Sequence, residues 1–266
     1  MILGIDFGSS NVDAVLMHGK KIAMHRSIEA DLFNKDFFFR GFPIEKIKKI
    51  KVTGAYSGKA GKKLFNLNVR KVDEIKAIAV GGKFVSKKSN ALIVSMGSGT
   101  AFVSVKGNKF RHIGGTAVGG KTLMNLGRLL IGDDNVLILE KRAKYGKAER
   151  VDLTLKEIYP KGIGLLPSNA TASHFGSLKN PNKDDLSAAL FNLVGQVVGS
   201  IAGFASKAFN QKTIVFTGHL AESRLIKEII EKRIFWLGKA KTVFPKNSGI
   251  ATAIGAALAW LFIEFI

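Results

Sequence analysis

The sequence predicts an α/β protein built of two lobes, each a mixed sheet flanked by helices, with a cleft between them. Its 266 residues are 46% hydrophobic and 23% charged, which is a globular composition that can bury a sizeable core. Each half of the chain opens with three strand patterns and places a glycine-containing turn between the first two. This weak internal repeat indicates two similar units whose glycine turns face each other across the cleft.

The first half, residues 1–88, begins with three strand patterns in "MILGIDFGSSNVDAVLMHGKKIAMHRSI". Gly8–Ser10 and His18–Gly19 supply the turn residues between them. The elements expected to follow are a strand in "KKIKVTG", a helix in "SGKAGKKLF" (Ser57–Phe65), a strand in "LNVRKV" and a helix from about Asp73 to Val85. The Gly81-Gly82 pair indicates that this last helix passes close to neighbouring backbone.

The second half, residues 89–266, repeats the opening scheme in "ALIVSMGSGTAFVSVKGNKFRHIGG", with turns at Gly97–Gly99 and Gly107–Asn108. The elements expected to follow are helices at Gly120–Ile131, Asp134–Tyr145 and about 183–209, a buried strand in "TIVFTGHL", a helix near Ala221–Ile234, the strand "AKTVF" and a final helix. The two halves together predict an N-terminal lobe at 1–88 and a C-terminal lobe at 89–266.

The absence of cysteine excludes disulfides, thiolate zinc sites, iron–sulfur clusters and cysteine nucleophiles. The net charge of +21 raises the question of nucleic-acid binding. The lysines, however, are scattered in pairs such as Lys62-Lys63, and no zinc-finger or helix-turn-helix pattern accompanies them. We therefore expect a generally cationic surface and no nucleic-acid partner. The histidines without metal-ligand spacing, expected at turns or on the surface, are His18, His25 and His219.

The N-terminus passes directly into a strand pattern and lacks the basic segment and cleavage site of a signal peptide, which indicates a cytoplasmic protein. The last 17 residues, "IATAIGAALAWLFIEFI", are nearly apolar. A membrane tail anchor and a buried helix are both compatible with this composition. The small residues and the interruption by Glu264 favour the buried helix, so no membrane partner is expected.

"GIDFGSSN" (Gly4–Asn11) places a carboxylate at the end of a strand and two hydroxyls directly after a glycine. Backbone N–H groups at such a turn can surround a phosphate, and Asp6 can hold Mg²⁺ through water. A strand, a glycine–serine turn and a second strand also form a common hairpin. Taken alone, this segment leaves both interpretations open.

"VSMGSGTAF" (Val94–Phe102) repeats the arrangement in the second half, which favours a pair of phosphate turns. "GGTAVGGKT" (Gly114–Thr122) adds glycines directly before a helix, whose N-terminus attracts anions. "VFTGHL" (Val215–Leu220) supplies a fourth turn, suited to the adenine or ribose end of a nucleotide. The expected nucleotide-binding residues are Asp6, Gly8, Ser9, Ser10, Gly97, Gly99, Thr100, Gly119, Gly120, Lys121 and Gly218.

Four segments, "GIDFGSSN", "VSMGSGTAFVSV", "GGTAVGGKTLMNLG" and "LKEIYPKGIGLLPSNATASHFGSL", resemble the type II (eukaryotic-like) pantothenate kinases. That family belongs to the actin/Hsp70/sugar-kinase superfamily, so the resemblance implies two actin-like (ribonuclease H-like) lobes around an ATP cleft. It implies an ATP:pantothenate 4'-phosphotransferase that uses ATP and Mg²⁺ in the first step of coenzyme A biosynthesis. It also implies a homodimer formed through the second lobe.

The resemblance further implies a catalytic carboxylate at the start of a helix in the first lobe, which falls on Glu74 in "KVDEIKAIAVGG". A base there orients the substrate alcohol and accepts its proton, while positioning and charge neutralisation provide most of the rate enhancement. Asp73 beside it is expected to cap the helix. Without the resemblance, Glu74 is more simply explained as an acid that complements the helix dipole.

The family's substrate pocket takes an arginine whose position falls on His112, with Arg111 one residue earlier. Only one of these two side chains can face the cleft if both lie on a strand, and a carboxylate would prefer the arginine. A family hydroxyl falls on Ser98. The expected substrate-binding residues are Ser98, Arg111, His112, Gly115 and Thr116.

The chain departs from the family pattern at Ala101, where a second hydroxyl is usual, and at Asp13, where lysine is usual. Lys121 stands in place of a family glycine, and we hypothesise that it supplies the phosphate cation missing at Asp13. "VDAVL" around Asp13 resembles hydantoinase-type members of the superfamily. These departures keep open a kinase or ATPase acting on another small molecule, such as N-acetylglucosamine or a hydantoinase-like substrate.

Two further classes compete with a small-molecule kinase. Dehydratase activators of the same superfamily need cysteines for a shared cluster, and this chain has none. A non-enzymatic basic binding module explains the charge but not the paired glycine turns. His174 and Phe175, within "TASHFG", are expected either to border the substrate or to pack in the interior.

Overall fold

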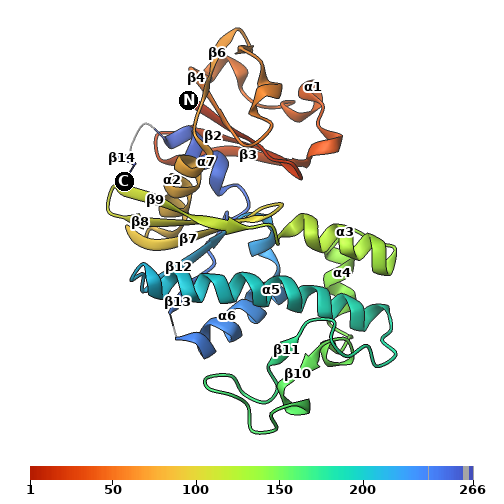
Figure 1. The fold of residues 1–266 in the computed structure, drawn as a ribbon. Helices are drawn as coiled ribbons and strands as arrows, with labels where there is room; N and C mark the ends of the chain where they lie inside the picture. The colour runs from red at the N-terminus through yellow and green to blue at the C-terminus, as the bar shows by residue number, and fades with distance from the viewer. Residues whose placement is uncertain (239, 260–263, 266) are drawn as a thin grey trace.

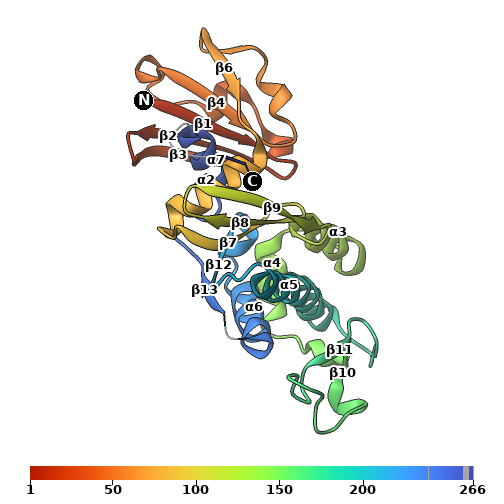
Figure 2. The ribbon, with the colours of Figure 1, turned by 60° about the vertical axis from the view of Figure 1, so that its left-hand side comes forward.

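Two six-stranded sheets lie one above the other, with two helices between them and the other long helices beneath the second sheet (Figure 1). The computed structural model describes residues 1–238 and 240–259 and the backbone of residues 264–265. Figure 2 shows the same order of layers from a second direction. The sheet–helix–sheet–helix arrangement agrees with the α/β fold expected from the sequence.

The first sheet has the strand order β3-β2-β1-β4-β6-β5. Its strands are β1 (Ile2–Phe7), β2 (Asn11–His18), β3 (Lys21–Glu29), β4 (Lys49–Thr53), β5 (Lys63–Leu64) and β6 (Leu67–Lys71). β1 pairs antiparallel with β2 and parallel with β4, which makes the sheet mixed. The outer face packs Leu3, Ile5 and Phe7 against phenylalanines around the short helix α1 (Lys35–Phe38).

The second sheet has the strand order β13-β12-β7-β8-β9-β14. Its strands are β7 (Asn90–Met96), β8 (Thr100–Lys106), β9 (Lys109–Thr116), β12 (Thr213–Thr217), β13 (Lys241–Val243) and β14 (Glu264–Phe265). β7, β8 and β9 form an antiparallel meander, and β12 joins β7 in parallel. Each sheet therefore opens with a three-stranded meander, as the internal repeat predicts.

Helices α2 (Glu74–Ser86) and α7 (Ala251–Leu258) cross each other between the two sheets. The crossing depends on glycine, because a Cβ at Gly81 would lie 1.9 Å from Ala251 O and one at Gly255 would lie 1.8 Å from Ala77 O. The predicted close approach of backbone at Gly81 is thus confirmed. α7 packs on Val15 and Met17 of the first sheet, although it lies between β13 and β14 of the second sheet in the chain.

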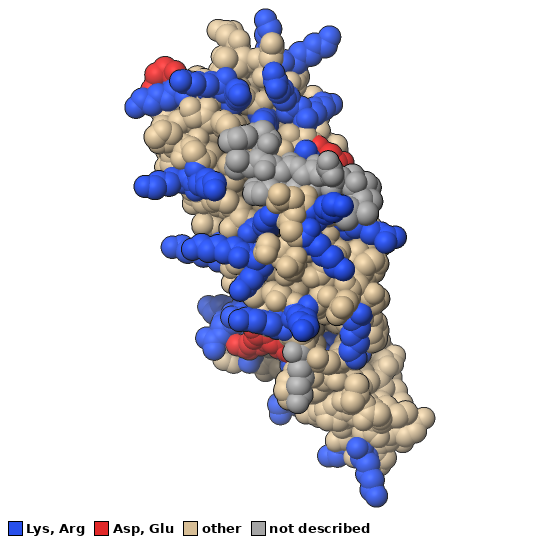
Figure 3. Space-filling model, turned by 90° about the vertical axis from the view of Figure 1, so that its left-hand side faces the viewer, with Lys and Arg blue, Asp and Glu red and all other residues tan. Residues whose placement is uncertain are grey.

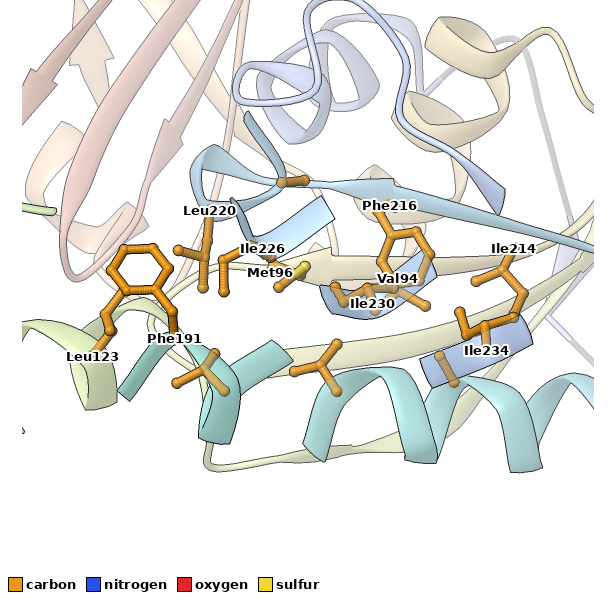
Figure 4. Packing of buried hydrophobic residues seen from close by; sticks show 14 of the residues in the cluster. Val94, Met96, Leu123, Phe191, Ile214, Phe216, Leu220, Ile226, Ile230 and Ile234 are labelled. Carbon is orange, nitrogen blue, oxygen red and sulfur yellow. The ribbon is translucent and has the colours of Figure 1, made fainter. Parts of the chain in front are cut away.

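The largest hydrophobic core lies between the second sheet and the outer helices (Figure 4). These helices are α3 (Gly120–Ile131), α4 (Val136–Ala143), α5 (Lys183–Ala208) and α6 (Arg224–Leu237). Val94 and Phe216 from the sheet meet Phe191 of α5 and Ile230 of α6 in this core. α5 is long and apolar enough to cross a membrane by composition, but more than half of that window is buried within the protein.

Two expectations about local structure are corrected. The predicted helix at Ser57–Phe65 is instead a 3₁₀ turn, Ser57–Ala60, followed by β5. Gly61 adopts φ 68°, which ends the turn, and the next residues pair back on β6. A small antiparallel pair of β10 (Leu153–Thr154) and β11 (Thr171–Ser173), at the end of the molecule away from the first sheet (Figure 1), was not anticipated. Of the predicted final helix, residues 260–263 and 266 lie outside the described residues.

Candidate active site

The first glycine turn, Gly8–Ser10, follows Asp6, which stands opposite Asp13 in the β1–β2 ladder. Within the described part of the chain, Asp6 Oδ1 is buried and has no hydrogen-bond partner. Gly54, at φ 92°, makes room for this atom, because a Cβ there would lie 2.3 Å from it. Asp6 also lines a cleft of about 580 Å³, so we infer that its second oxygen faces the cleft.

Burial raises the pKa of Asp6 to about 8, and the negative charges of Asp13 and Glu74 add to the rise, while His219 opposes it. Burial disfavours the charged form of Asp6, and a cation beside the carboxylate would stabilise that form. Mg²⁺ takes oxygen ligands and keeps waters and substrate phosphates, so Asp6 fits a water-mediated role. Among the described residues, no group of three or more histidine or acidic side chains is placed to hold a metal ion.

The second glycine turn, Gly97–Gly99, meets the first turn directly. Ser98 Oγ lies 2.9 Å from Ser10 Oγ and is also hydrogen-bonded to Ser9 Oγ. The two turns come from different sheets, and the bonded serines lie 88 and 89 residues apart in the chain. The expectation that they face each other is therefore confirmed.

The third glycine cluster packs against the second turn. Gly120 N–H donates to Gly97 O at 2.8 Å, and Lys121 N–H donates to Ser98 O at 3.1 Å. A Cβ at Gly119 would lie 2.7 Å from Ser98 O, so glycine is needed for this contact. The expectation that the first N–H groups of α3 are free for an anion is thereby corrected, because carbonyl groups of the turn already accept from them.

The cleft brings together most of the residues that sequence reasoning selected. The selected residues that line it are Asp6, Gly8, Ser9, Ser10, Glu74, Gly97, Ser98, Gly99, Thr100, Gly120 and Gly218. The selected residues outside its lining are Arg111, His112, Gly115, Thr116, Gly119 and Lys121. The structure therefore gathers both turns and the candidate base at one place and leaves the candidate substrate cations elsewhere.

Glu74 is the first residue of α2, and its carboxyl group lines the cleft. Asp73 caps the helix as predicted, accepting from Lys76 N–H at 2.8 Å. The Glu74 residue as a whole is exposed, but its carboxyl group is partly desolvated against the cleft wall. This desolvation, and secondly the charge of Asp73, raises the pKa of Glu74. A carboxylate with a raised pKa is better suited to accept a proton near neutral pH.

The β8–β9 register determines which of Arg111 and His112 faces α2. Arg111 pairs with Ser104, and its guanidinium lies 5.7 Å from the ring centre of Phe209, at the end of α5. His112 pairs with Val103, which packs in the cluster that contains α2. His112 is therefore the residue on the face toward the first lobe, and Arg111 lies on the opposite face.

Several residues in the cleft were not anticipated. Met124, Val136, Leu137 and Leu220 form an apolar part of the lining. The helix predicted at Asp134–Tyr145 contains Val136 and Leu137, but nothing in the sequence indicated that its first turn would reach the cleft.

The structure also shows where His219 and His174 lie. His219, expected at a turn or on the surface, lines the cleft and is hydrogen-bonded to Asp13. The turn position is confirmed, but the contact with Asp13 across the cleft was not anticipated; it arises because β12, which leads into this turn, lies beside β7. His174 instead lies in a polar network with Asp152, outside the cleft lining.

Comparison with known proteins is consistent with this arrangement. The model of the Fumble family matches residues 90–259. The chain is 30% identical over 227 residues to the type II pantothenate kinase of Bacillus anthracis, covering 80% of each chain. It is 29% identical over 272 residues to the type II pantothenate kinase of Oceanobacillus iheyensis, covering 97% of this chain and 98% of that protein.

Solved structures share the fold at much lower identity. Component A of the (R)-2-hydroxyglutaryl-CoA dehydratase of Acidaminococcus fermentans is 16% identical, with a TM-score of 0.67 over 97% of this chain and 96% of that chain. A ROK family glucokinase of Streptomyces griseus, in complex with glucose and AMPPNP, is 13% identical, with a TM-score of 0.60 over 96% and 97%. The match of the Fumble family model to residues 90–259, together with the identity to type II pantothenate kinases over most of the chain, shows that this chain belongs to the Fumble family.

Proposed function

We propose that this protein is an ATP-dependent pantothenate kinase that makes 4'-phosphopantothenate in the first step of coenzyme A biosynthesis. The single observation that carries the proposal is the composition of one cleft. It is lined by two opposed glycine–serine turns and by the carboxyl groups of Asp6 and Glu74. The curated relatives named above, which are type II pantothenate kinases, support the choice of substrate.

The turns would bind the triphosphate through backbone N–H groups and through the hydroxyls of Ser9, Ser10 and Ser98. These hydroxyls now bond to one another across the two turns, so a phosphate would exchange these contacts for its own. Asp6 would hold Mg²⁺ through water, and bound Mg²⁺ would neutralise charge on the phosphates. Lys121 remains our prediction for a phosphate cation, although its side chain is outside the lining.

Glu74 would accept the proton of the pantothenate alcohol. In this phosphoryl transfer, the bond between the γ-phosphorus and the oxygen that remains with ADP breaks, and a bond forms between the γ-phosphorus and the alcohol oxygen. The proton lost by the alcohol goes to the Glu74 carboxylate. α2 lies between the two sheets and is capped by Asp73, so its first residue, Glu74, would present its carboxylate to the cleft.

The adenine ring would lie on the apolar part of the lining, between Val136 and Leu137 of α4 and Leu220 after β12. An aromatic base gains from contact with such a surface, and glycine at position 218 lets this part of the lining pack closely on Met96. Gly218 adopts φ 88°, and a Cβ there would lie 2.3 Å from Met96 O. We further propose a cytoplasmic homodimer, as the family resemblance implies.

A substrate panel tests the proposal. Purified protein is incubated with ATP and Mg²⁺ and with pantothenate, pantoate or N-acetylglucosamine, and ADP release and the phosphorylated product are measured. Phosphorylation of pantothenate is expected. Phosphorylation of the sugar alone would overturn the proposed substrate.

A kinase for another small alcohol is the second candidate. It is favoured by Ala101, which lines the cleft without a hydroxyl, and by the position of Arg111 on the face away from α2. His112, on the nearer face, would make a weaker contact with a carboxylate than an arginine does. A preference for uncharged alcohols in the same panel would favour this candidate.

A further inference from the structure

A hydrogen-bonded pair, Asp13 and His219, joins the two lobes at the cleft. Asp13 lies on β2 of the first sheet, and His219 follows β12 of the second sheet. His219 Nε2 is 2.9 Å from Asp13 Oδ1 and 3.0 Å from Asp13 Oδ2. The Asp13 side chain is buried, whereas about a third of the imidazole is exposed. One edge of the ring is therefore held in the protein while the other remains accessible.

The backbone around His219 fixes the direction of the ring. Gly218 N–H donates to Ser248 O at 2.8 Å, which anchors the turn. A Cβ at Gly249 would lie 3.0 Å from His219 Nδ1, so Nδ1 lies beside this glycine, which lines the cleft. Nδ1 has no hydrogen-bond partner within the described part of the chain. It is a donor available to a ligand whenever the ring is protonated.

The charges of the cleft make this histidine unusual. The ionisable residues of its described lining are Asp6, Asp13, Glu74, Glu140, Glu222 and His219, with no lysine or arginine. The outer surface is very different, since Lys and Arg are spread along the whole face shown in Figure 3. A nucleotide carries several negative charges, so a lining of this kind needs a cation.

The groups around His219 favour its charged form. Burial by itself would lower the pKa of His219, but the hydrogen bond and charge of Asp13, followed by the charges of Glu222 and Asp6, outweigh it and raise the pKa. Asp13 reaches the ring from β2 and Asp6 from β1, whereas Glu222 lies in the same turn as His219. Asp13 therefore holds the Nε2 edge of the ring, while the Nδ1 edge lies beside Gly249 at the cleft, with the Glu222 carboxyl group also near that glycine.

We propose that His219 is a side-chain cation that binds the phosphate end of the nucleotide from within the cleft lining, and that Asp13 is its positioning residue. Nδ1–H would donate to a phosphate oxygen while Nε2–H stays on Asp13, and a hydrogen bond between charged groups of this kind is strong. Asp13 and Asp6 adjoin the Gly8–Ser10 turn, which places the ring near the phosphates and not the base. This inference rests on the proposed function only in taking the ligand to be a nucleotide.

Binding of AMPPNP with Mg²⁺ and binding of adenosine, measured by calorimetry without pantothenate, test the inference. His219→Asn should weaken AMPPNP binding by about tenfold or more, the size expected from losing one hydrogen bond between charged groups. Adenosine, which has no phosphate, should bind unchanged. Asp13→Asn should weaken AMPPNP binding less, and the double variant should be no weaker than His219→Asn, because the two residues act as one unit.

His174→Asn is the matched control, because His174 also pairs with a buried aspartate, at 3.1 Å, but outside the cleft lining. His174→Asn should leave the binding of AMPPNP and of adenosine unchanged. The inference would be overturned if His219→Asn weakened the binding of AMPPNP and of adenosine equally, or left AMPPNP binding unchanged. If His219→Asn does not fold, the same comparison is made with Asp13→Asn. Failure of the wild type to bind AMPPNP would overturn both proposals, and binding without pantothenate phosphorylation would overturn only the proposed substrate.

Discussion

Glu74 combines an accessible carboxyl group with a raised pKa, so its ionisation should control turnover at the acidic side of the pH range. Glu74→Gln should lower kcat by about 10²–10⁴-fold, the range for losing a general base, and leave the KM for ATP nearly unchanged. Steady-state rates with both substrates varied provide the measurement. A variant with more than half of the wild-type kcat would rule out the base.

The charge of Asp73 can be separated from its role as helix cap. Asn also caps helices, so Asp73→Asn removes the charge and keeps the accepted hydrogen bond. Because the Asp73 charge contributes to the raised pKa of Glu74, this variant should lower that pKa. The acidic limb of the kcat/KM profile should then move to lower pH. A limb that does not move would mean that Glu74 is not the group that titrates.

Asp6 should make stability depend on pH. Its pKa is raised from 3.8 to about 8 in the folded protein, so the unfolded chain ionises first. The stability associated with Asp6 is fully present below pH 3.8 and is lost as the pH rises through 8. In EDTA, Asp6→Asn should therefore melt at a higher temperature than the wild type at pH 8.5, and the two should converge toward pH 4. Equal melting temperatures across this range would contradict the raised pKa.

Lys51 on β4 is buried, and no ion pair or hydrogen bond of its ammonium group occurs within the described residues. Burial, followed by the charges of Lys49, Arg70 and Lys76, lowers its pKa from 10.5 to about 8. The stability associated with Lys51 is therefore fully present above pH 10.5 and is lost as the pH falls through 8. Lys51→Met should raise the melting temperature at pH 7 by roughly 2–4 °C for each kcal/mol gained.

Thermal melts from pH 7 to 11 provide the measurement for Lys51. The gain should shrink toward pH 11, where the wild-type lysine is neutral in both states. Lys141→Met, at an exposed position of α4, is the control and should change little. A lower melting temperature for Lys51→Met at pH 7 would show that its charge is stabilising.

At single positions, the sequence predicted residues whose chemistry is local. Asp6, the serine turns and the cap at Asp73 follow from a few consecutive letters. The pair of Asp13 and His219 does not, because 206 residues separate its members and only the sheet order brings them together. The side of the sheet on which Arg111 lies was also not predictable. A strand pattern shows that side chains alternate between the two faces of a sheet, but not which face meets α2.

Among the elements, the crossing of α2 and α7 offers a sharp test. In an ordinary helix interior, replacing Gly by Ala stabilises by roughly 0.5–1 kcal/mol. At Gly81 the new Cβ would meet Ala251 O at 1.9 Å, so the helices must separate, and Gly81→Ala should cost about 1–3 kcal/mol. Urea denaturation measures the difference.

Gly203→Ala in α5 is the matched control for this crossing. Its new Cβ would meet the flexible end of Leu237 at 3.1 Å, which can move aside. This variant should be nearly neutral. A Gly81→Ala protein as stable as the Gly203→Ala protein would show that the helices are not held at backbone contact.

Elements with strong local signals were predicted well. α2, α3 and α5 each combine an apolar repeat with a clear start, and their observed bounds lie within a residue or two of the expected ones. Ser57–Phe65 was misread because Gly61 and the pairing of β5 with β6 override a weak helical pattern. Two-residue and three-residue strands such as β10 and β11 exist only through their partner and carry no signal of their own.

For the whole molecule, the charge of +21 is spread over the surface and is absent from the described cleft lining. A diffuse positive surface attracts nucleic acid without reading its sequence. Mobility-shift assays should therefore show weak binding of random DNA at 50 mM salt that is largely lost at 200 mM. Sequence-specific binding that persists at the higher salt concentration would instead indicate a dedicated nucleic-acid site.

The division of the chain into lobes at residues 1–88 and 89–266 remains a prediction. The strand repeat was readable because each meander is local, whereas the destination of α7 was not. An apolar helix rich in small residues fits any closely packed site equally well. α7 can pack against β1 and β2 only because residue 4 is glycine. A Cβ on Gly4 would lie 2.2 Å from Ala253 O.

The position of α7 has a consequence for the order in which the protein can fold during synthesis. Val15 and Met17 emerge from the ribosome early, but the helix that covers them, Ala251–Leu258, is made some 230 residues later. This part of the first sheet therefore lacks its α7 cover while strands β7 to β13 of the second sheet are being made. A nascent chain stalled before α7 should be an easier target for proteases and chaperones than one released with α7 in place.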